Sequence, residues 1–454
     1  MQSRGPLSKR ISLTLLADNP VVSGTQGTTL DDWRGHYADR TSGLSASEVR
    51  ALFAVASRPE VVSLAGGMPA VSALPLDLIT NTMTKVMREQ GAAALQYGSG
   101  QGLPVLREQI LEVCALEGIS ASANNLVITT GSQQALDLIT KLFIDEGDVV
   151  FAESPSYLGA LGIFRSYQAD VQHVDTDEEG MIPEALEDAI ARAQAAGKNL
   201  KLLYLIPNFQ NPSGVTLSAD RRPRLIEIAK RHKILIIEDN PYGLLWFDTP
   251  SPDAMRSIDE DGIVYLGSFS KMFAPGFRVG WALAPHAIRE KLVLAAESAI
   301  LCPSALTQMV ISDYLATSDW KAQIDVFRGL YRGRRDAMLG ALDEYLPGFH
   351  RTEPNGGFYV WLSLPEYLDS KAMLPRAVSE LVAYTPGTAF YTNGLGRSNI
   401  RLAFCYPTEE DIREGVRRLS EVIRQESELF DTFSPPIADV TQLSHVVSPP
   451  PDLA

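Results

Sequence analysis

Short apolar runs alternate with segments of helical periodicity through the middle of the chain, and this alternation constrains the fold more than any other feature. We expect strands at residues 126–129, 148–152, 171–174, 202–206, 234–237, 263–266 and 279–283. Helices are expected at residues 134–143, 158–167, 183–195 and 221–231. Such an alternation predicts an α/β fold with a parallel or mostly parallel sheet that carries helices on both faces.

The pattern changes after residue 284, where longer helices precede two short apolar runs at residues 358–361 and 400–404. These runs are expected to be strands of a smaller α+β domain. The polar, turn-rich start of the chain reads as an arm, and the proline-rich end as a disordered tail. The expected parts are an arm at 1–45, the N-terminal part of the small domain at 46–75, a large cofactor-binding domain at 76–330, the C-terminal part of the small domain at 331–430, and the tail at 431–454.

Composition excludes several classes of function. The chain has 454 residues and a formal net charge of −15, which disfavours nucleic acid because a phosphate backbone requires a basic face. No apolar run approaches the roughly 20 residues that a membrane-spanning helix needs. The apolar run at residues 11–16 is short and has no small-residue cleavage pattern, so we expect no signal peptide.

Cysteine and histidine usage points to a reducing compartment and to no structural metal. The three cysteines are odd in number and form no CxxC pair, which favours the cytoplasm. The six histidines include no HExxH pair, so a zinc site is not expected.

A lysine stands just beyond one of the expected strands. Ser268-Phe269-Ser270-Lys271 follows the run at 263–266, and Arg278 comes seven residues after Lys271. In parallel sheets ligands bind beyond the carboxyl ends of the strands. A lysine alone is a surface amine by default, but a lysine desolvated beside cations is a nucleophile that forms Schiff bases. Arginine supplies a planar fork that suits phosphate.

Asp239 follows the neighbouring expected strand at 234–237. A carboxylate at the end of a buried strand is costly unless it is paired. A pyridinium nitrogen would pair with it, and the carboxylate would in turn hold that nitrogen protonated. The alternative, a cap for a following helix, is disfavoured by Pro241. Together with Lys271 and Arg278, Asp239 therefore predicts pyridoxal 5′-phosphate as the cofactor.

Three more strand ends carry weaker signals. Gly131-Ser132-Gln133 opens a helix and fits a phosphate cradle, although it fits a plain helix start as well. Tyr157 can stack on a planar ring or serve as an ordinary core aromatic. Asn211 lies in the turn at 207–214, which can fix its amide in space.

The ordered set of motifs resembles the fold type I, class I/II aminotransferases that use pyridoxal phosphate, and most of all their 2-aminoadipate and kynurenine aminotransferase branch. The resemblance covers about residues 45–425. It is carried by the stretches at 63–69, 95–98, 128–137, 207–214, 268–271 and 399–402.

The resemblance implies a role for each candidate residue. Lys271 would form the Schiff base with the cofactor and move the substrate proton, and Asp239 would pair with the pyridine nitrogen. Asn211 and Tyr242 would hydrogen-bond the phenolic oxygen, and Arg401 would grip the substrate α-carboxylate. The remaining implied residues are Tyr157, stacked on the ring; Ser132, Gln133, Ser268, Ser270 and Arg278, around the phosphate; Tyr97, reaching the phosphate of the neighbouring subunit; and Gly67, assisting Arg401.

The arm departs from the pattern of the relatives. Relatives that accept 2-aminoadipate use an arginine of the arm for the distal carboxylate. Gly43 falls at that place in this chain, and Arg40 lies three residues earlier. Arg40 is therefore the candidate substrate-binding residue of the arm.

The resemblance implies a homodimeric transaminase with shared active sites and a ping-pong mechanism. The amino donor would be an aromatic, branched-chain or 2-aminoadipate-like L-amino acid, and the acceptor a 2-oxo acid, expected to be 2-oxoglutarate. A lyase or decarboxylase on the same fold is the first alternative, because the cofactor shell is shared. The second is a ligand-sensing aminotransferase-like module behind a DNA-binding domain, which the shortness of the first 45 residues and the acidic net charge of the chain disfavour.

Overall fold

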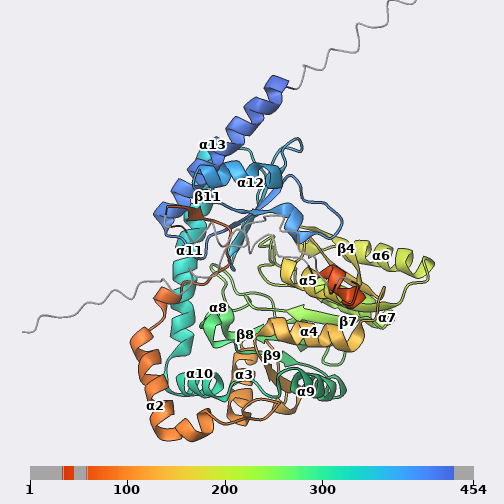
Figure 1. Cartoon of the computed structure of the whole chain (residues 1–454), viewed down its shortest axis with the longest axis vertical. Helices are drawn as coiled ribbons and strands as arrows, with labels where there is room; N and C mark the ends of the chain where they lie inside the picture. The colour runs from red at the N-terminus through yellow and green to blue at the C-terminus, as the bar shows by residue number, and fades with distance from the viewer. Residues whose placement is uncertain (1–32, 34, 45–57, 59, 434–454) are drawn as a thin grey trace, which may run out of the picture.

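The computed structural model describes residues 33, 35–44, 58 and 60–433. Within these residues the largest sheet has eight strands in the order β2-β9-β8-β7-β6-β3-β4-β5 (Figure 1). The strands are β2 (Leu126–Thr129), β3 (Val149–Ser154), β4 (Asp170–Asp177), β5 (Gly180–Met181), β6 (Leu200–Leu205), β7 (Leu235–Asp239), β8 (Ile263–Ser268) and β9 (Gly280–Leu283). Each strand expected from residues 126–283 is present, within a few residues of its predicted bounds.

The sheet is mostly parallel, as the sequence predicts. Strands β4, β3, β6, β7 and β8 run parallel to one another, whereas β9 is antiparallel to both β8 and β2. The connection from β8 to β9, residues 269–279, holds only two single helical turns and no crossover helix of the kind that joins parallel strands. Strand β5 adds a short antiparallel edge beside β4.

Helices cover both faces of this sheet. The helices are α4 (Ser132–Phe143), α5 (Leu158–Ser166), α6 (Pro183–Ala195), α7 (Arg221–Arg231) and α9 (His286–Ile300). Alternate residues of β6 show the two faces. Leu202 and Tyr204 belong to the core that α4 and α5 cover, and Leu203 and Leu205 belong to the core under α6 and α7. A strand buried on both faces explains the continuous apolar runs in the sequence.

A second part, blue in Figure 1, stands above the large sheet. Strand β13 lies between β10 and β12 in an antiparallel sheet, and β1 pairs with β11. The elements are β1 (Val62–Ser63), β10 (Tyr359–Ser363), β11 (Val382–Ala383), β12 (Thr385–Pro386), β13 (Asn399–Ala403), α12 (Ser370–Ser379) and α13 (Glu409–Phe433). The β1–β11 pair attaches a segment from near the start of the described chain to its C-terminal part.

Four further helices lie outside the two groups described above. Among them, α2 packs against α10. They are α2 (Leu76–Ala94), α3 (Pro104–Ala115), α10 (Ala305–Thr317) and α11 (Trp320–Tyr345). The predicted domain boundary at 330–331 falls inside α11, which runs from the level of α10 up to the second part (Figure 1). The predicted domain limits remain a prediction.

The two ends of the described chain bear on the predicted arm and tail. Most of the expected arm lies outside the described residues, except η2 (Asp39–Gly43) and its neighbours. At the other end, α13 continues to Phe433, so residues 431–433 of the expected tail are helical. Across the described ranges, no helix has both the length and the apolar character needed to cross a membrane.

Candidate active site

The carboxyl ends of β6, β7 and β8 open on a pocket of about 530 Å³. All predicted site residues line this pocket except Tyr97 and Arg40. Those that line it are Gly67, Ser132, Gln133, Tyr157, Asn211, Asp239, Tyr242, Ser268, Ser270, Lys271, Arg278 and Arg401. The pocket therefore brings together side chains from both parts of the chain.

Lys271 lies in α8 (Phe269–Met272), a single helical turn that follows β8 directly. The turn is fixed by its cap, because the Ser268 hydroxyl accepts a hydrogen bond from the backbone N–H of Ser270 at 3.0 Å. Lys271 Nζ donates to the carbonyl of Gly67 at 2.8 Å and stands 5.4 Å from the ring centre of Phe358. Burial lowers the pKa of Lys271 to about 8. An amine in this state is a nucleophile and a proton acceptor near neutral pH.

Asp239 is the last residue of β7 and is 6% exposed. Its Oδ2 accepts a hydrogen bond from the Tyr204 hydroxyl at 2.8 Å, whereas the buried Oδ1 has no partner among the described residues. Burial raises the pKa of Asp239 to about 6, against the hydrogen bond from Tyr204, which lowers it. A buried acceptor without a donor is costly. A protonated ring nitrogen would supply that donor, so the site fits a pyridine cofactor.

An anion cradle lies at the start of α4. Gly131 has φ 81° at the N-cap, and Ser132 and Gln133 form the first turn, whose N–H groups have no helical acceptor. The Arg278 guanidinium contacts this cap by donating to the carbonyl of Thr130 at 3.2 Å. A Cβ atom at Gly131 would clash with Arg278 Nη2. The helix N-terminus and the guanidinium together fit a phosphate.

Arg401 comes from β13 and is 3% exposed. Its guanidinium donates to Asn211 Oδ1 at 2.8 Å and to the carbonyl of Ala65 at 2.6 Å, and it stacks 4.3 Å from the ring centre of Tyr359. Across the described residues no acidic side chain forms an ion pair with it. A buried cation without a counter-ion favours an anionic ligand such as a carboxylate.

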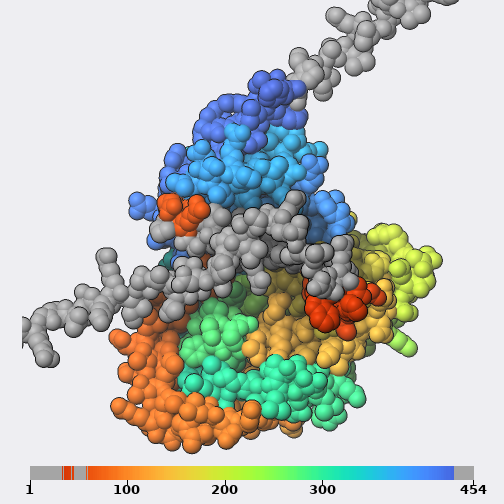
Figure 2. Space-filling view, viewed as in Figure 1, coloured from red at the N-terminus to blue at the C-terminus, as the bar shows by residue number. Residues whose placement is uncertain are grey.

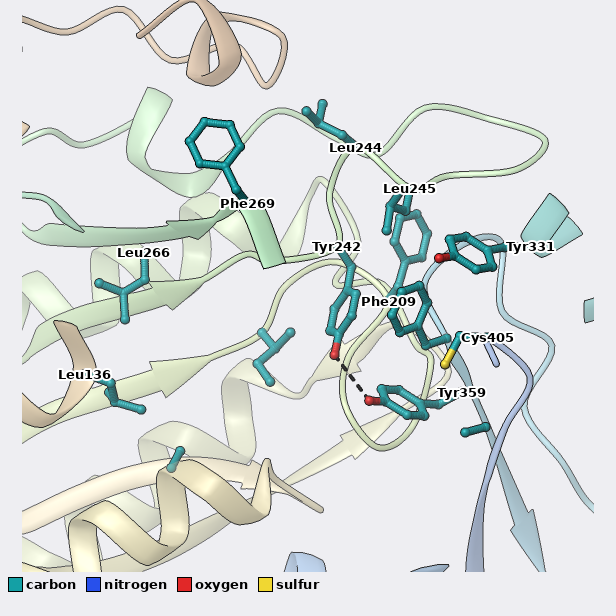
Figure 3. Packing of buried hydrophobic residues seen from close by; sticks show 14 of the residues in the cluster. Leu136, Phe209, Tyr242, Leu244, Leu245, Leu266, Phe269, Tyr331, Tyr359 and Cys405 are labelled. Carbon is teal, nitrogen blue, oxygen red and sulfur yellow. Dashed lines mark hydrogen bonds between the residues drawn. The ribbon is translucent and has the colours of Figure 1, made fainter. Parts of the chain in front are cut away.

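Two tyrosines predicted to contact the cofactor, Tyr157 and Tyr242, both line the pocket. The Tyr242 hydroxyl donates to the Tyr359 hydroxyl at 3.4 Å (Figure 3). Tyr157, at the N-cap of α5, donates to Gln133 Oε1 at 3.2 Å. Both rings are therefore fixed by hydrogen bonds at the mouth of the large sheet.

Tyr97 and Arg40 lie away from the pocket. The Tyr97 side chain is 77% exposed on the loop after α2, and its predicted role concerns a second copy of the chain. Arg40 belongs to η2, the red segment on the outer surface in Figure 2, which packs beside α5. A Cβ atom at Gly43 would clash with the carbonyl oxygen of Arg165 in α5, so this glycine allows the close contact. The predicted roles of Tyr97 and Arg40 remain predictions.

Tyr359 and Tyr204 contact the site and were not singled out from the sequence. Tyr359 lies in an expected strand, after two glycines, and its hydroxyl reaches so close to Gly67 that a Cβ atom there would clash. Tyr204 occupies the expected strand at 202–206, where its hydroxyl is the one polar side-chain group between leucines. A hydroxyl buried among leucines is the signal that was available for Tyr204.

No metal site accompanies this pocket in the part of the chain that the structure describes. No group of three or more histidine, cysteine, aspartate or glutamate side chains lies close enough there to hold an ion.

The sequence model of the class I and II aminotransferases matches residues 60–419, so the chain belongs to this family. An aromatic-amino-acid aminotransferase of Thermococcus litoralis is 41% identical over 399 residues, covering 87% of this chain and 95% of the relative. The structure of a Pyrococcus horikoshii kynurenine aminotransferase in complex with PMP is 38% identical, with a TM-score of 0.83, and covers 87% of this chain and 99% of that one.

A third relative carries a cofactor adduct. The α-aminoadipate aminotransferase of Thermus thermophilus, complexed with N-(5′-phosphopyridoxyl)-L-leucine, is 35% identical, has a TM-score of 0.81 and covers 87% of this chain and 99% of its own. The predicted fold type and branch are thereby confirmed. The chain is a transaminase that depends on pyridoxal 5′-phosphate.

Proposed function

We propose that this enzyme transfers the amino group of an aromatic, branched-chain or 2-aminoadipate-like L-amino acid to 2-oxoglutarate by a ping-pong mechanism. The observation that carries the proposal is the convergence of Lys271, Asp239 and Arg401 on one pocket. Asp239 and Arg401 are buried and Lys271 is partly buried, and each has an atom or a charge that a bound cofactor or substrate would satisfy.

The residues divide the chemistry between them. When bound, pyridoxal phosphate supplies an electron sink for negative charge at the substrate Cα atom. Asp239 pairs with the ring nitrogen, and the α4 cradle with Arg278 holds the phosphate. Arg401 binds the α-carboxylate and so orients the Cα–H bond toward Lys271. The neutral Lys271 amine would take that proton and give it back at the cofactor carbon C4′, which is joined to Cα through the nitrogen.

The lining of the pocket favours aromatic and branched-chain donors. Met68, Leu158 and Pro275 present apolar surface to it. Its lining cations within the described ranges are Lys271, Arg278 and Arg401, and each already has a proposed function. A donor with a distal carboxylate would depend on Arg40 or on residues outside the described ranges.

A screen of amino donors against 2-oxoglutarate tests the substrate class. Aromatic and branched-chain donors should give higher kcat/KM values than 2-aminoadipate. The Arg40→Ala variant should lose activity with 2-aminoadipate and keep it with aromatic donors if Arg40 reads the distal group. Equal losses with both donor classes would contradict that role, and parallel lines in double-reciprocal plots would support the ping-pong order.

The proposed assembly is a homodimer in which Tyr97 reaches the phosphate of the neighbouring subunit. Apolar side chains are exposed along α2 and on the loop that carries Tyr97, where Met83, Met87 and Leu95 are each at least 41% exposed. Apolar patches of this kind mark protein interfaces. Sedimentation of the active enzyme tests the proposal, and a fully active monomer would contradict it.

A cytoplasmic location is proposed from the cysteines. Cys114 and Cys405 are buried free thiols, and Cys302 is free as well. Reduced thiols are typical of this compartment. Fractionation of the native cells, followed by an activity assay of each fraction, tests the location.

A further inference from the structure

Tyr204 is a fully buried tyrosine whose hydroxyl bonds to Asp239 across two neighbouring strands. It lies on β6, opposite Ile237 of β7 in the parallel register, and its hydroxyl donates to Asp239 Oδ2 at 2.8 Å. The ring is fixed edge-on against Phe164 of α5, with 5.5 Å between ring centres. The donor is therefore held rigidly by the sheet and by a helix that covers it.

The proton of this hydrogen bond belongs to the tyrosine. Burial, and then the charge of Asp239, raise the pKa of Tyr204 far above its ordinary value. The hydroxyl therefore keeps its proton and is the donor, and Oδ2 is the acceptor. Tyr157 also interacts with the charge of Asp239, and Glu153 of β3 interacts with Tyr204. The β8 residue opposite Asp239, Leu266, is apolar.

The second carboxylate oxygen is left for the cofactor. Oδ1 of Asp239 has no hydrogen-bond partner in the described part of the protein, and Asp239 lines the pocket. A carboxylate with one oxygen anchored cannot rotate freely, so the free oxygen keeps one direction. Anchoring also favours the ionised carboxylate, because a hydrogen bond to the charged form stabilises it.

We propose that Tyr204 is a positioning residue for transamination: its hydroxyl keeps the Asp239 carboxylate ionised and fixed, so that Oδ1 alone is presented to the cofactor's ring nitrogen. This inference rests on the proposed role of Asp239. Tyr204 touches neither cofactor nor substrate and acts through Asp239.

The Tyr204→Phe variant tests the proposal with a matched control. Phenylalanine keeps the ring and its packing on Phe164 and removes only the hydroxyl. The control is Tyr265→Phe on β8, since Tyr265 is equally buried and its hydroxyl donates to a carboxylate outside the pocket, that of Glu117. Each holoenzyme is diluted across the acid-to-neutral range, and the release of cofactor is followed by its absorbance.

The expected result is a release at least about tenfold faster in Tyr204→Phe, since a hydrogen bond to a charged group is lost. The pH at which half of the cofactor is released should also rise, because Asp239 then protonates more readily. Tyr265→Phe should leave this midpoint unchanged, although it lowers the melting temperature. An unchanged midpoint in Tyr204→Phe would overturn the inference.

Repeating the substitution in an Asp239→Ala enzyme distinguishes a role of Tyr204 in positioning Asp239 from a role in packing alone. With Asp239→Ala already in place, Tyr204→Phe should have no further effect on cofactor release. The same effect in both backgrounds would show that Tyr204 acts through packing and would overturn the inference. If Asp239→Ala by itself retained the cofactor as well as the unmodified enzyme, the proposed role of Asp239 would fail, and the inference with it.

Discussion

At the scale of single residues, the chemistry depends on ionisable groups that the fold holds away from their ordinary pKa values. Lys271 and Asp239 shift in opposite directions for one reason, since burial disfavours the charged form of each. The shifts bring an amine and a carboxylic acid, normally many pH units apart, to within about two units of each other. Perturbed groups of this kind are typical of active sites.

The pKa of Lys271 predicts how fast the cofactor-free enzyme captures pyridoxal phosphate. Because the folded pKa is lowered to about 8, the neutral amine predominates above that pH. The capture rate should therefore rise as the pH increases through about 8 and then level off. Stopped-flow absorbance measures it, with Lys271→Ala as the control that forms no covalent link and has no turnover. A rise centred near the ordinary lysine pKa would contradict the described environment of Lys271.

Arg401 gives a prediction about substrate binding. In Arg401→Lys the charge remains, but the planar fork that bonds Asn211 and stacks on Tyr359 is lost. The KM for the amino donor should rise about ten- to a hundredfold, while kcat changes much less. Steady-state kinetics measure both constants. Arg328→Lys is the control, because Arg328 stacks on Trp246 at 3.8 Å outside the pocket; an equal rise in KM there would refute a specific role for Arg401.

At the scale of elements, the site depends on how strand ends, helix starts and one loop meet. The N-terminus of α4 stands against β9, where a Cβ atom at Gly280 would come within 2.5 Å of the backbone nitrogen of Ser132. His173 of β4 contacts the loop that follows η7 (Gly387–Phe390), and the Phe390 ring of η7 lies 4.9 Å from the Arg401 guanidinium. Neither contact joins residues that are close in sequence.

The helix start predicts a selective effect of Gly131→Ala. Alanine would be strained at φ 81°, and its Cβ atom would displace Arg278 from the cradle. Cofactor affinity, measured by equilibrium titration, should fall about tenfold or more, because charge-assisted bonds to the phosphate are lost.

The control for this prediction is Gly147→Ala. Gly147 also has a positive φ, 80°, but a Cβ atom there would meet no other atom within 4 Å. Both variants should lose a similar amount of thermal stability from backbone strain. If Gly147→Ala weakened cofactor binding as much as Gly131→Ala does, strain and not the cradle would be the cause.

The contact between β4 and the loop after η7 predicts a pH-dependent stability. His173 Nε2 accepts from the backbone N–H of Thr392 at 3.1 Å, so its proton must reside on Nδ1, which donates to the carbonyl of Glu153 at 2.9 Å. Burial lowers the pKa of His173. The stability that neutral His173 contributes is therefore fully present above about pH 6.5 and is lost as the pH falls through its lower folded pKa.

Thermal unfolding of paired variants checks this sign. The melting temperature should fall between neutral and mildly acid pH, and this fall should be a few degrees larger for the unmodified enzyme than for His173→Gln. His350→Gln, at an exposed histidine, should follow the unmodified enzyme. Identical pH slopes for His173→Gln and the unmodified enzyme would rule out the contact as a source of acid sensitivity.

At the scale of the whole molecule, the sequence predicted the large sheet well, because its strands are buried on both faces and read as continuous apolar runs. It also predicted which strand-end residues share the pocket, since parallel strands end at one edge. The helices α2 and α3 were not predicted. In α2 the pattern is blurred by non-helical geometry at Gln90 and by many exposed apolar residues.

The rest depends on contacts that no local pattern encodes. Tyr359 meets Gly67 and Tyr242, which are distant in the chain, and Figure 3 shows the two tyrosine hydroxyls facing each other. Tyr204 reaches Asp239 only because β6 and β7 are neighbours in register. The antiparallel direction of β9 likewise depends on how the chain connects β8 to β9, and the amino-acid composition of the strand does not reveal it.

The most direct test of the central claim is a half-reaction with the holoenzyme and an aromatic amino acid alone, without any 2-oxo acid. The account predicts stoichiometric conversion of the cofactor to its pyridoxamine form, followed by absorbance, together with one equivalent of the matching 2-oxo acid. Adding 2-oxoglutarate should then restore the starting spectrum. Continuous release of ammonia, or of carbon dioxide, without accumulation of the pyridoxamine form would contradict transamination at this site.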